Sequence, residues 1–485
     1  MLPVLPVLLW TDALLLALLV VVGLFVWWSR HEDHLRAPWR KVAHSRGGMV
    51  AVTVLAVYAA IGLLDSLHYR RALPAEPGKP VVYAPEVVSV LDALAQPLRD
   101  GAERTFSAPF AATGFVKETV TRPDGSQTRD YPRLRHGGRH LKDPEAELGP
   151  DIARRALAGL AAGVLLWTVV VGLITQAVAV RRGQSFALVS RAAWRGEHPL
   201  PLRAVFVTLA LLCAVLVPLV VLSAHYHVLG TDKVGQDVFY QTLKSIRTGL
   251  VIGTVTTLVM LPFALSLGIM AGYFGGWIDD AIQYVYTTLS SIPGVLLIAA
   301  AVLMMQVYMD TRAEIFDSIT RRADFRLVFL CVILGVTSWT GLCRLLRGET
   351  LKLRELDFVQ AARAFGVSPW RIMLRHVLPN VLHLVLITTV LGFSGLVLAE
   401  AVLSYVGVGV DPAMNSFGTM INAARLEMAR EPIVWWSLFA AFVFMFVLVL
   451  CANLFADAVR DALDPRLRAE VSSSRAIALS RESGA

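Results

Sequence analysis

Charged residues are scarce in this chain of 485 residues. Asp, Glu, Lys and Arg make up only 17% of it, whereas hydrophobic residues make up 56%. The mean hydropathy of +0.60 is well above that of an ordinary soluble domain. This composition excludes a soluble globular protein and indicates an integral membrane protein.

Cysteine pairs and clusters of metal-binding residues are also missing. The four cysteines lie in apolar runs without paired or metal-type spacing, and are Cys213, Cys331, Cys343 and Cys451. Cysteines in such runs usually behave as small buried hydrophobic side chains. His225 and His227 are isolated from other ligand types. We therefore expect neither a disulfide framework nor a metal site.

A phosphate-binding loop of the form G-x-x-x-x-G-K-[ST] is absent, so we expect no nucleotide or other cofactor on this chain. The formal net charge of +8 would suggest nucleic acid as the partner of a soluble protein. Here the basic residues cluster beside apolar runs, where they set membrane topology. The expected surroundings are therefore membrane lipid and not nucleic acid.

Apolar runs long enough to cross a membrane recur along the chain. A membrane helix needs about 20 apolar residues, and the sequence predicts nine spans, at residues 7–28, 47–66, 156–180, 204–224, 250–272, 281–309, 327–346, 381–405 and 432–456. Arginine-rich loops follow the first and third spans and indicate the cytoplasmic face. The first basic residue, Arg30, follows the first apolar run, whereas a cleavable signal carries its charge ahead of it. The prediction is a multi-pass, all-α protein with its N-terminus outside and its C-terminus in the cytoplasm.

The predicted spans divide the chain into five parts, which are two N-terminal spans (1–66), an external hydrophilic insert (67–155), a third span with a cytoplasmic loop (156–203), a six-span unit (204–468) and a cytoplasmic tail (469–485). The insert is rich in proline and poor in apolar residues, which leaves little core to offset chain entropy. The sequence alone leaves open whether it is a compact domain or an ordered loop.

A polar stretch at residues 347–380 separates the seventh and eighth predicted spans. Asp357 and Gln360 match a capping box at a helix start. An apolar stripe follows at helical spacing and consists of Phe358, Ala361, Ala362 and Phe365. Gly366 then stands where a left-handed helix end needs glycine. The pattern predicts a helix of about two turns.

A second short helix is predicted directly after that glycine. Ser368 and Pro369 match a helix cap and a first-turn proline. A stripe of Trp370, Met373, Leu374 and Val377 follows, and Pro379 is expected to end the helix. A basic amphipathic pair of this kind is typical both of a membrane interface and of a protein-docking element, and periodicity does not separate the two.

The residues of this stretch resemble a known family. Gln360-Ala361-Ala362, Gly366 and the run His376-Val377-Leu378-Pro379 are similar to the "EAA" loop of bacterial binding-protein-dependent ABC importer permeases. The family usually has Glu at the position of Gln360. Three further segments are similar to the C-type permeases of the dipeptide, oligopeptide and nickel subgroup, and are Leu229–Val238, Ser291–Gly294 and Ala399–Gly409.

The resemblance implies a type I ABC importer transmembrane domain of about six core spans at residues 204–468, preceded by about three extra spans. It implies that the polar loop docks as a coupling helix on a separate ATPase, so this chain is a transport subunit and not an enzyme. The implied partners are two ATPase subunits, a second permease and an extracytoplasmic substrate-binding protein in a bacterial inner membrane. The implied cargo is a dipeptide or oligopeptide, or a nickel complex, carried by alternating access.

Glu400 and Pro293 are the candidate residues for the translocation path. Glu400 lies in an apolar span, where a carboxylate is costly unless it faces protein, water or the headgroups. Solvation by the outer headgroups is the competing interpretation for Glu400, and also for Asp12 near the outer end of the first span. Pro293 and Gly294 interrupt the sixth span, either as a hinge or pore lining or as an ordinary kink.

Two other classes of function stay open on the sequence alone. An ion-coupled transporter would ordinarily need several ionisable groups inside its spans, and only Glu400 is a serious candidate. A membrane enzyme would place its active site in the external insert, where no nucleophile–base or metal constellation stands out.

Overall fold

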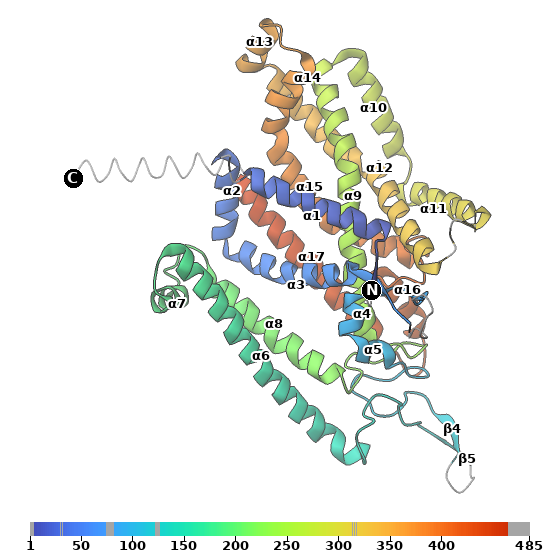
Figure 1. Ribbon diagram of the computed structural model, residues 1–485. Helices are drawn as coiled ribbons and strands as arrows, with labels where there is room; N and C mark the ends of the chain where they lie inside the picture. The colour runs from blue at the N-terminus through green and yellow to red at the C-terminus, as the bar shows by residue number, and fades with distance from the viewer. Residues whose placement is uncertain are drawn as a thin grey trace.

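The computed structural model describes residues 4–463, apart from residues 30, 32, 74–81, 122–126, 313, 315 and 317. The predicted tail at 469–485 and the end of the predicted six-span unit, residues 464–468, lie outside the described residues. Helices dominate the rest of the chain, with a three-stranded antiparallel sheet β1-β2-β3 and a two-stranded ribbon β4-β5 (Figure 1).

The N-terminal half carries all the strands and eight helices. Its elements are β1 (Val4–Val7), α1 (Trp10–Ser29), α2 (Asp33–His44), α3 (Arg46–Ser66), β2 (His68–Arg71), β3 (Val88–Ser89), α4 (Val90–Leu94), α5 (Gln96–Asp100), β4 (Glu118–Thr121), β5 (Gln127–Asp130), α6 (Pro144–Arg182), α7 (Phe186–Arg195) and α8 (Leu202–Ser223).

The C-terminal half contains helices and no strand among its described residues. Its elements are α9 (Val238–Phe274), α10 (Gly276–Ser291), α11 (Gly294–Thr311), α12 (Ile319–Arg354), α13 (Asp357–Ala364), α14 (Pro369–Ile372), the π-helical turn η1 (Met373–Val377), α15 (Leu378–Tyr405), α16 (Phe417–Glu427) and α17 (Trp436–Leu463).

Within the described residues, eight helical segments are long and apolar enough to cross a membrane: α3, α6, α8, α9, α11, α12, the continuous run Pro369–Tyr405, and α17. The apolar part of α1, Trp10–Leu24, is a shorter helix of the same character. These segments correspond in order to the nine predicted spans.

The predicted boundaries are wrong at several spans. The predicted span at 281–309 is two helices, because the backbone at Ile292 is extended and α11 begins directly after Pro293. Three other helices are much longer than predicted, since α6 starts at Pro144, α9 at Val238 and α12 ends at Arg354. Polar turns at the N-terminal ends of α6 and α9 and at both ends of α12 lowered the local hydropathy, so a hydropathy window missed them.

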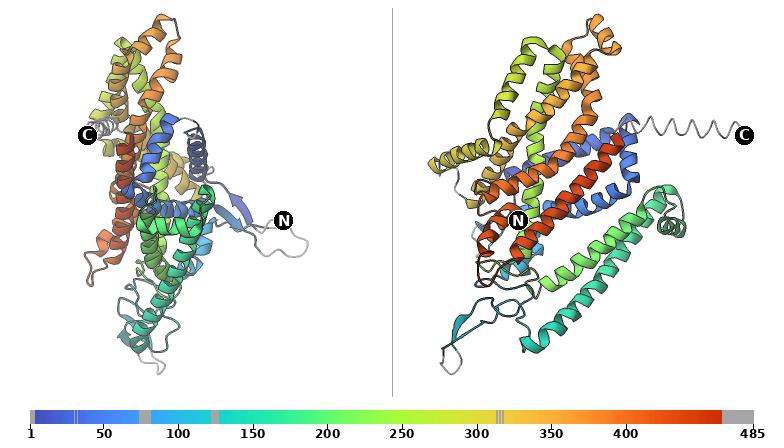
Figure 2. Two further views of the ribbon diagram at one scale, coloured as in Figure 1. Left: turned by 90° about the vertical axis from the view of Figure 1, so that its left-hand side faces the viewer. Right: turned by 180° about the vertical axis from the view of Figure 1, so that it is seen from behind.

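The extra N-terminal helices are part of the molecule's main core. Buried Ala51, Val54 and Tyr58 of α3 share one apolar cluster with Ile246 of α9 and Leu448 of α17. Figure 2 shows α3 running beside α17 and α9, with the α6–α8 hairpin alongside α3. The first three predicted spans are therefore packed onto the six-span unit.

The described residues of the insert form short strands and helices that pack on the rest of the chain. Its Phe106 is buried in the same cluster as α3 and α17, and Ser107 N–H donates to Thr231 Oγ1 at 2.6 Å. Its C-terminal end turns into α6, where Tyr226 O–H donates to Asp151 Oδ2 at 2.8 Å. The loop between α8 and α9 is the surface onto which the insert folds.

Candidate functional site

The predicted two-helix loop stands at one end of the molecule, opposite the insert with β4 and β5 (Figure 1). α13 begins at Asp357, as predicted, but the capping box is wrong, because Leu356 is the cap residue and no side chain caps the helix. Gln360 instead donates through Nε2 to Glu355 Oε2 at 3.3 Å. An exposed first turn leaves its N–H groups to solvent, so the helix does not need the cap.

The turn between the two helices has the predicted geometry. Gly366 has φ +73°, the left-handed conformation that glycine adopts without strain. Pro369 occupies the first turn of α14 and Ser368 is its cap residue, although the Ser368 side chain makes no capping bond. The turn directs α14 back toward the bundle.

Only one side of this loop is covered by the chain itself. Val359, 1% exposed, packs with Ile372, Met373 and Val377 in the cluster that contains buried residues of α9, α10 and α12. The predicted apolar stripe is not on this covered side of the loop. Ala362 is half-buried, and Phe358, Ala361 and Phe365 are exposed. Phe365 is 87% exposed and Leu374 is 65% exposed. The loop therefore presents an apolar surface that no described residue covers.

The second predicted helix does not end at Pro379. The chain passes from α14 through η1 into α15, and Pro379 lies in the first turn of α15 directly after Leu378. Proline is tolerated there because a first-turn N–H has no partner within its own helix. The loop is thus continuous with a long membrane helix, which forms a rigid connection between the loop and the bundle.

Glu400 is buried inside the bundle, at 1% exposed, and accepts a hydrogen bond from Ser404 Oγ at 2.6 Å. Solvation by headgroups is therefore the wrong interpretation of this carboxylate. Ser416, the cap residue of α16, is a second hydrogen-bond partner of Glu400, and Cys331 of α12 lies close enough to interact with its charge.

The break at Pro293 lies beside a row of exposed hydroxyl side chains. Pro293 is exposed and caps α11. The exposed serine and threonine residues of α10 are Thr287, Thr288, Ser290 and Ser291. Polar side chains and an interrupted backbone at membrane depth usually face protein or water. This side of α10 is therefore suited to a protein contact or a hydrated path.

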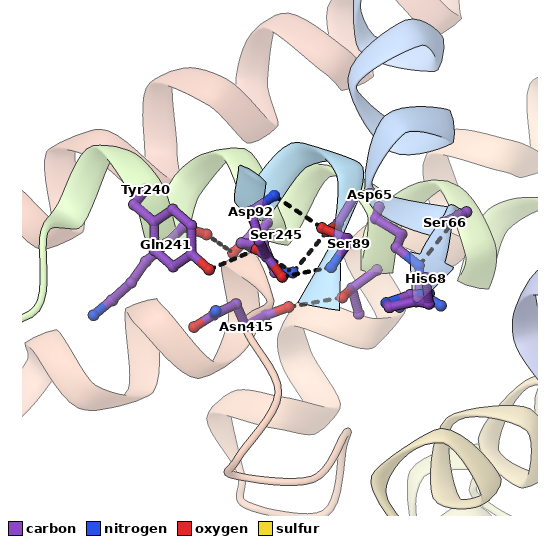
Figure 3. Close-up of polar contacts among 12 residues, drawn as sticks. Asp65, Ser66, His68, Ser89, Asp92, Tyr240, Gln241, Ser245 and Asn415 are labelled. Carbon is purple, nitrogen blue, oxygen red and sulfur yellow. Dashed lines mark hydrogen bonds and ion pairs between the residues drawn. The ribbon is translucent and has the colours of Figure 1, made fainter. Parts of the chain in front are cut away.

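A buried group of charged residues, the α9 ion cluster, joins the N-terminal helices to α9. It consists of Asp12, Asp65, His68, Asp92, Lys244, Arg247 and Asp324. Lys244 Nζ lies 2.6 Å from Asp65 Oδ1 and 2.9 Å from Asp92 Oδ1. Figure 3 shows Asp65, Ser89 and Asp92 meeting beside Tyr240 of α9. The negative charges facing Lys244 thus come from α3 and α4.

Arg247 occupies the other half of the cluster. Its Nη2 lies 2.6 Å from Asp12 Oδ1 and donates to Thr11 Oγ1 at 2.7 Å. His68 Nδ1 lies 2.7 Å from the second oxygen of Asp12. The interpretation of Asp12 as a carboxylate solvated by the headgroups is therefore wrong, because its side chain is bound within the protein. A cavity of about 240 Å³ opens beside the cluster and is lined partly by Asn415 and Met414.

Outside the spans, Asp92 is strongly acidic. Burial alone would raise the pKa of Asp92, but the charge of Lys244, the Ser89 N–H and the Tyr240 hydroxyl outweigh it and lower the pKa to about 2. Asp92 is therefore ionised at neutral pH and pairs with Lys244.

Sequence reasoning missed this cluster because residues 238–249 were assigned to a loop. A signal was available: Asp237 is a good helix cap residue, and its side chain accepts from Tyr240 N–H at 3.0 Å. A helix starting there places Lys244 and Arg247 three residues apart on one face. A buried cation, Arg247, and a half-buried one, Lys244, on the same face call for carboxylates from another segment.

A second buried charged group fixes the insert to the start of α9. His227 Nδ1 lies 2.7 Å from Asp237 Oδ2, and Nε2 lies 3.4 Å from Glu103 Oε1. Glu103 also accepts from the backbone N–H groups of Arg135, His136 and Gly137. Among the described residues, no group of three or more His, Cys, Asp or Glu side chains is placed to hold a metal ion.

Comparison with known proteins agrees with these features. Residues 264–469 match the family described as "Binding-protein-dependent transport system inner membrane component". The oligopeptide transport system permease protein OppC of Mycobacterium tuberculosis (strain ATCC 25618 / H37Rv) is 36% identical over 242 residues, which cover 50% of this chain and 77% of OppC. The glutathione transport system permease protein GsiD of Pectobacterium atrosepticum is 33% identical over 246 residues, which cover 51% of this chain and 74% of GsiD.

Among solved structures, an inward-facing MetNI methionine ABC transporter aligns with 47% of this chain and 98% of its own, at 17% identity and a TM-score of 0.35. That likeness is too low to carry an argument about this chain. The family match and the sequence relatives are sufficient, and they confirm the predicted fold class. The chain belongs to the family of inner-membrane permease subunits of binding-protein-dependent peptide ABC importers and has the type I importer transmembrane fold.

Proposed function

We propose that this chain is the permease subunit that moves a dipeptide or oligopeptide across the membrane by alternating access, driven by ATP hydrolysis on a separate subunit. The observation that carries the proposal is the uncovered apolar surface of the α13–α14 loop, formed by Phe358, Phe365, Trp370 and Leu374. Buried Val359 holds the other side of the loop on the bundle.

This surface suits a cleft on an ATPase. The loop is rigid, because the turn at Gly366 and the continuity of α14, η1 and α15 fix its direction. A rigid amphipathic helix pressed into a groove transmits motion to the helix it continues into. Movement of the ATPase pair would thereby tilt α15, which carries the buried Glu400.

The exposed hydroxyl row of α10 and the break at Pro293 are the proposed wall of the path, shared with a second permease. Hydroxyl side chains hydrogen-bond weakly to many solutes, as a path for varied peptides requires. A nickel complex has less support, since the relatives described above are named for oligopeptide and glutathione transport.

The remaining parts of the proposal concern the surroundings of the bundle. An extracytoplasmic binding protein would deliver the solute at the end that carries the insert, opposite the α13–α14 loop. The proposed orientation has the N-terminus outside and the C-terminus in the cytoplasm, as the arginine-rich loops indicate.

The test places a charge beside the uncovered apolar surface of the α13–α14 loop. Ala361→Arg puts a long cation on an exposed position of α13, and Ala187→Arg makes the same change at an exposed position of the amphipathic helix α7. In a reconstituted complex of permeases, ATPase and binding protein, we expect Ala361→Arg to abolish at least nine-tenths of substrate-stimulated ATPase activity and uptake, roughly a 10-fold loss or 1.4 kcal/mol of coupling.

The Ala187→Arg control should insert equally well and transport normally. Wild-type coupling in the Ala361→Arg complex, at equal amounts of protein in the membrane, would remove the basis of the proposal.

A further inference from the structure

A large cavity lies away from the coupling loop and from the α9 ion cluster. It measures about 640 Å³ and is bounded by the α2–α3 corner on one side and by the end of α7 and the start of α8 on the other. Figures 1 and 2 show these two corners facing each other. Nothing in the proposed transport cycle uses it.

The cavity wall is basic. Arg46, Arg195 and Arg203 line it, together with His44 and His198. The three arginines are exposed, and none of them has an ion pair with any residue that the structure describes. No Asp or Glu is among the lining residues. Three free guanidinium groups without a carboxylate among them create a local positive potential.

A buried donor adds to this charge. His198 is 8% exposed, and its Nδ1 accepts a hydrogen bond from Leu200 N–H at 3.1 Å. Nδ1 also lies 3.3 Å from Leu200 O, which would accept a hydrogen bond from the Nδ1–H tautomer. In the tautomer in which Nδ1 accepts from Leu200 N–H, and in the protonated ring, Nε2 carries a proton. This Nε2 is buried and has no hydrogen-bond partner. A buried N–H without an acceptor is costly, and an anion in the cavity would supply the acceptor.

Two helices also start at the cavity. α3 begins at Arg46 and α8 at Leu202, and both residues line the wall. Helix N-termini carry partial positive charge and favour anions. The C-terminus of α7 ends here as well, but the N–H groups of Gly196 and Glu197 already bond its last carbonyls.

Apart from Thr208, the rest of the wall consists of apolar residues and glycine, and it continues onto an exposed apolar surface of α8. Val50 and Val207 line the cavity, and Val207 begins an exposed apolar row on α8 that continues with Leu211 and Val215. A soluble anion would make no favourable contact with this apolar row, whereas the acyl chain of a lipid would lie along it. Basic pockets between membrane helices at the aqueous boundary are suited to anionic phospholipid headgroups.

We infer that this cavity binds a phosphate-bearing anion, and that the anion is the headgroup of an anionic membrane phospholipid. The phosphate oxygens are held by Arg46, Arg195 and Arg203, and an acyl chain follows α8. Such a lipid would bridge the α2–α3 corner to the α7–α8 corner and connect the α6–α8 hairpin to the main bundle.

The experiment uses the full chain, purified in detergent, stripped of lipid and exposed to phosphatidylglycerol, cardiolipin or phosphatidylethanolamine. The variant is the triple substitution Arg46→Gln, Arg195→Gln and Arg203→Gln. The control removes the same charge from nearby exposed arginines that do not line the cavity, through Arg181→Gln, Arg182→Gln and Arg191→Gln. Native mass spectrometry counts retained lipids, and thermal unfolding in each lipid reports stabilisation.

We expect about a fivefold loss of anionic-lipid affinity for each arginine removed and about 100-fold for the triple variant, with little change in the control. The zwitterionic lipid should bind weakly to all three proteins. Equal retention of anionic lipid by the triple variant and the control would contradict the proposal that this cavity binds the lipid headgroup.

A parallel arm separates the two sources of phosphate. Inorganic phosphate alone is titrated into the lipid-free chain, and we expect no stabilisation at concentrations at which phosphatidylglycerol stabilises it. Stabilisation by inorganic phosphate without stabilisation by phosphatidylglycerol would overturn the lipid as the ligand. If the triple variant does not fold, Arg203→Gln alone and Arg182→Gln alone give the same comparison with an expected difference of about fivefold.

Discussion

Lys244 and Arg247 lie on one face of α9, and both find their counter-charges in the first hundred residues of the chain. Lys244 contacts Asp65 and Asp92, and Arg247 contacts Asp12. Removing one partner of a buried pair typically costs about 3–5 kcal/mol, because the other charge stays buried and unpaired. These contacts therefore hold the N-terminal helices at a defined position on the six-span unit.

His227 predicts a pH dependence of stability. Burial alone would lower the pKa of His227, but its bonds to Asp237 and Glu103 outweigh this and raise it to about 9 from an ordinary 6.5. A raised pKa means that the protonated ring stabilises the folded chain. That stabilisation is complete below pH 6.5 and is lost as the pH rises toward 9. The loss is about 3 kcal/mol, since one pKa unit corresponds to about 1.4 kcal/mol.

Glu103 sets the acid side of the same profile. Burial would raise the pKa of Glu103, but His227 and three backbone N–H groups lower it to about 2 from an ordinary 4.5. Its stabilisation is present above pH 4.5 and is lost as the pH falls toward 2. We therefore expect this group to contribute most between pH 4.5 and 6.5.

The measurement is thermal unfolding of the purified full chain at pH 6.5 and pH 9. His227→Gln should be less stable than the wild type at pH 6.5 and should lose less stability on going to pH 9. His31→Gln, at an exposed histidine, is the control and should behave as the wild type. The same pH dependence in His227→Gln and in the wild type would contradict the assignment.

At the scale of single elements, the α13–α14 hairpin depends on its turn. An added Cβ at Gly366 would meet no neighbouring atom within 4 Å, so any cost of substitution comes from the backbone, whose φ is +73°. A residue with a side chain loses about 1–2 kcal/mol in that conformation. The turn is therefore sensitive even though it is sterically open.

Gly366→Ala should loosen the hairpin, and Gly348→Ala is the matched control. Gly348 lies inside α12, also with open space for a Cβ, where alanine is favoured by about 1 kcal/mol. Hydrogen exchange of residues 357–372 should speed up about 5- to 30-fold in Gly366→Ala and stay unchanged in Gly348→Ala, as the backbone penalty predicts. Equal exchange in both variants would show that the turn is not held by its glycine.

At the scale of the whole molecule, the N-terminal helices are an integral part of the fold. Starting the chain at residue 204 would remove Asp65 and Asp92 from Lys244 and Asp12 from Arg247, so that Asp324 of α12 would be the remaining carboxylate of the cluster. It would also break up the apolar cluster that α3 shares with Ala441 and Leu448 of α17. Loss of a buried partner of Arg247 costs several kcal/mol, which is comparable to the total stability of many domains, whereas half-buried Lys244 costs less.

We expect the chain beginning at 204 to give little monodisperse protein by size-exclusion chromatography. Co-expression of residues 1–203 as a separate chain should restore the yield, because it supplies the missing carboxylates. Lys244→Met with Arg247→Met should rescue the truncated chain in part. A truncated chain as abundant and stable as the full one would contradict the integral role of these helices.

Much of this architecture was predictable. Apolar runs at known bilayer length predicted the order of the membrane helices, because hydrocarbon thickness imposes a minimum run. Glycine at 366 and proline at 369 predicted the loop's turn, because each restricts the backbone locally. Asp357 was less informative, since an exposed helix start has water as an alternative partner for its N–H groups.

By itself the sequence determined the membrane class, the order of its helices, the place of the α13–α14 loop and the family, because these depend on local patterns along the chain. Only the tertiary structure decided that Asp12 and Glu400 are buried, that α10 and α11 are separate helices, and that the N-terminal carboxylates neutralise Lys244 and Arg247. The physical reason is distance along the chain. Asp12 and Arg247 are 235 residues apart, and a charge's burial and partner depend on which segments pack together, which no local pattern records.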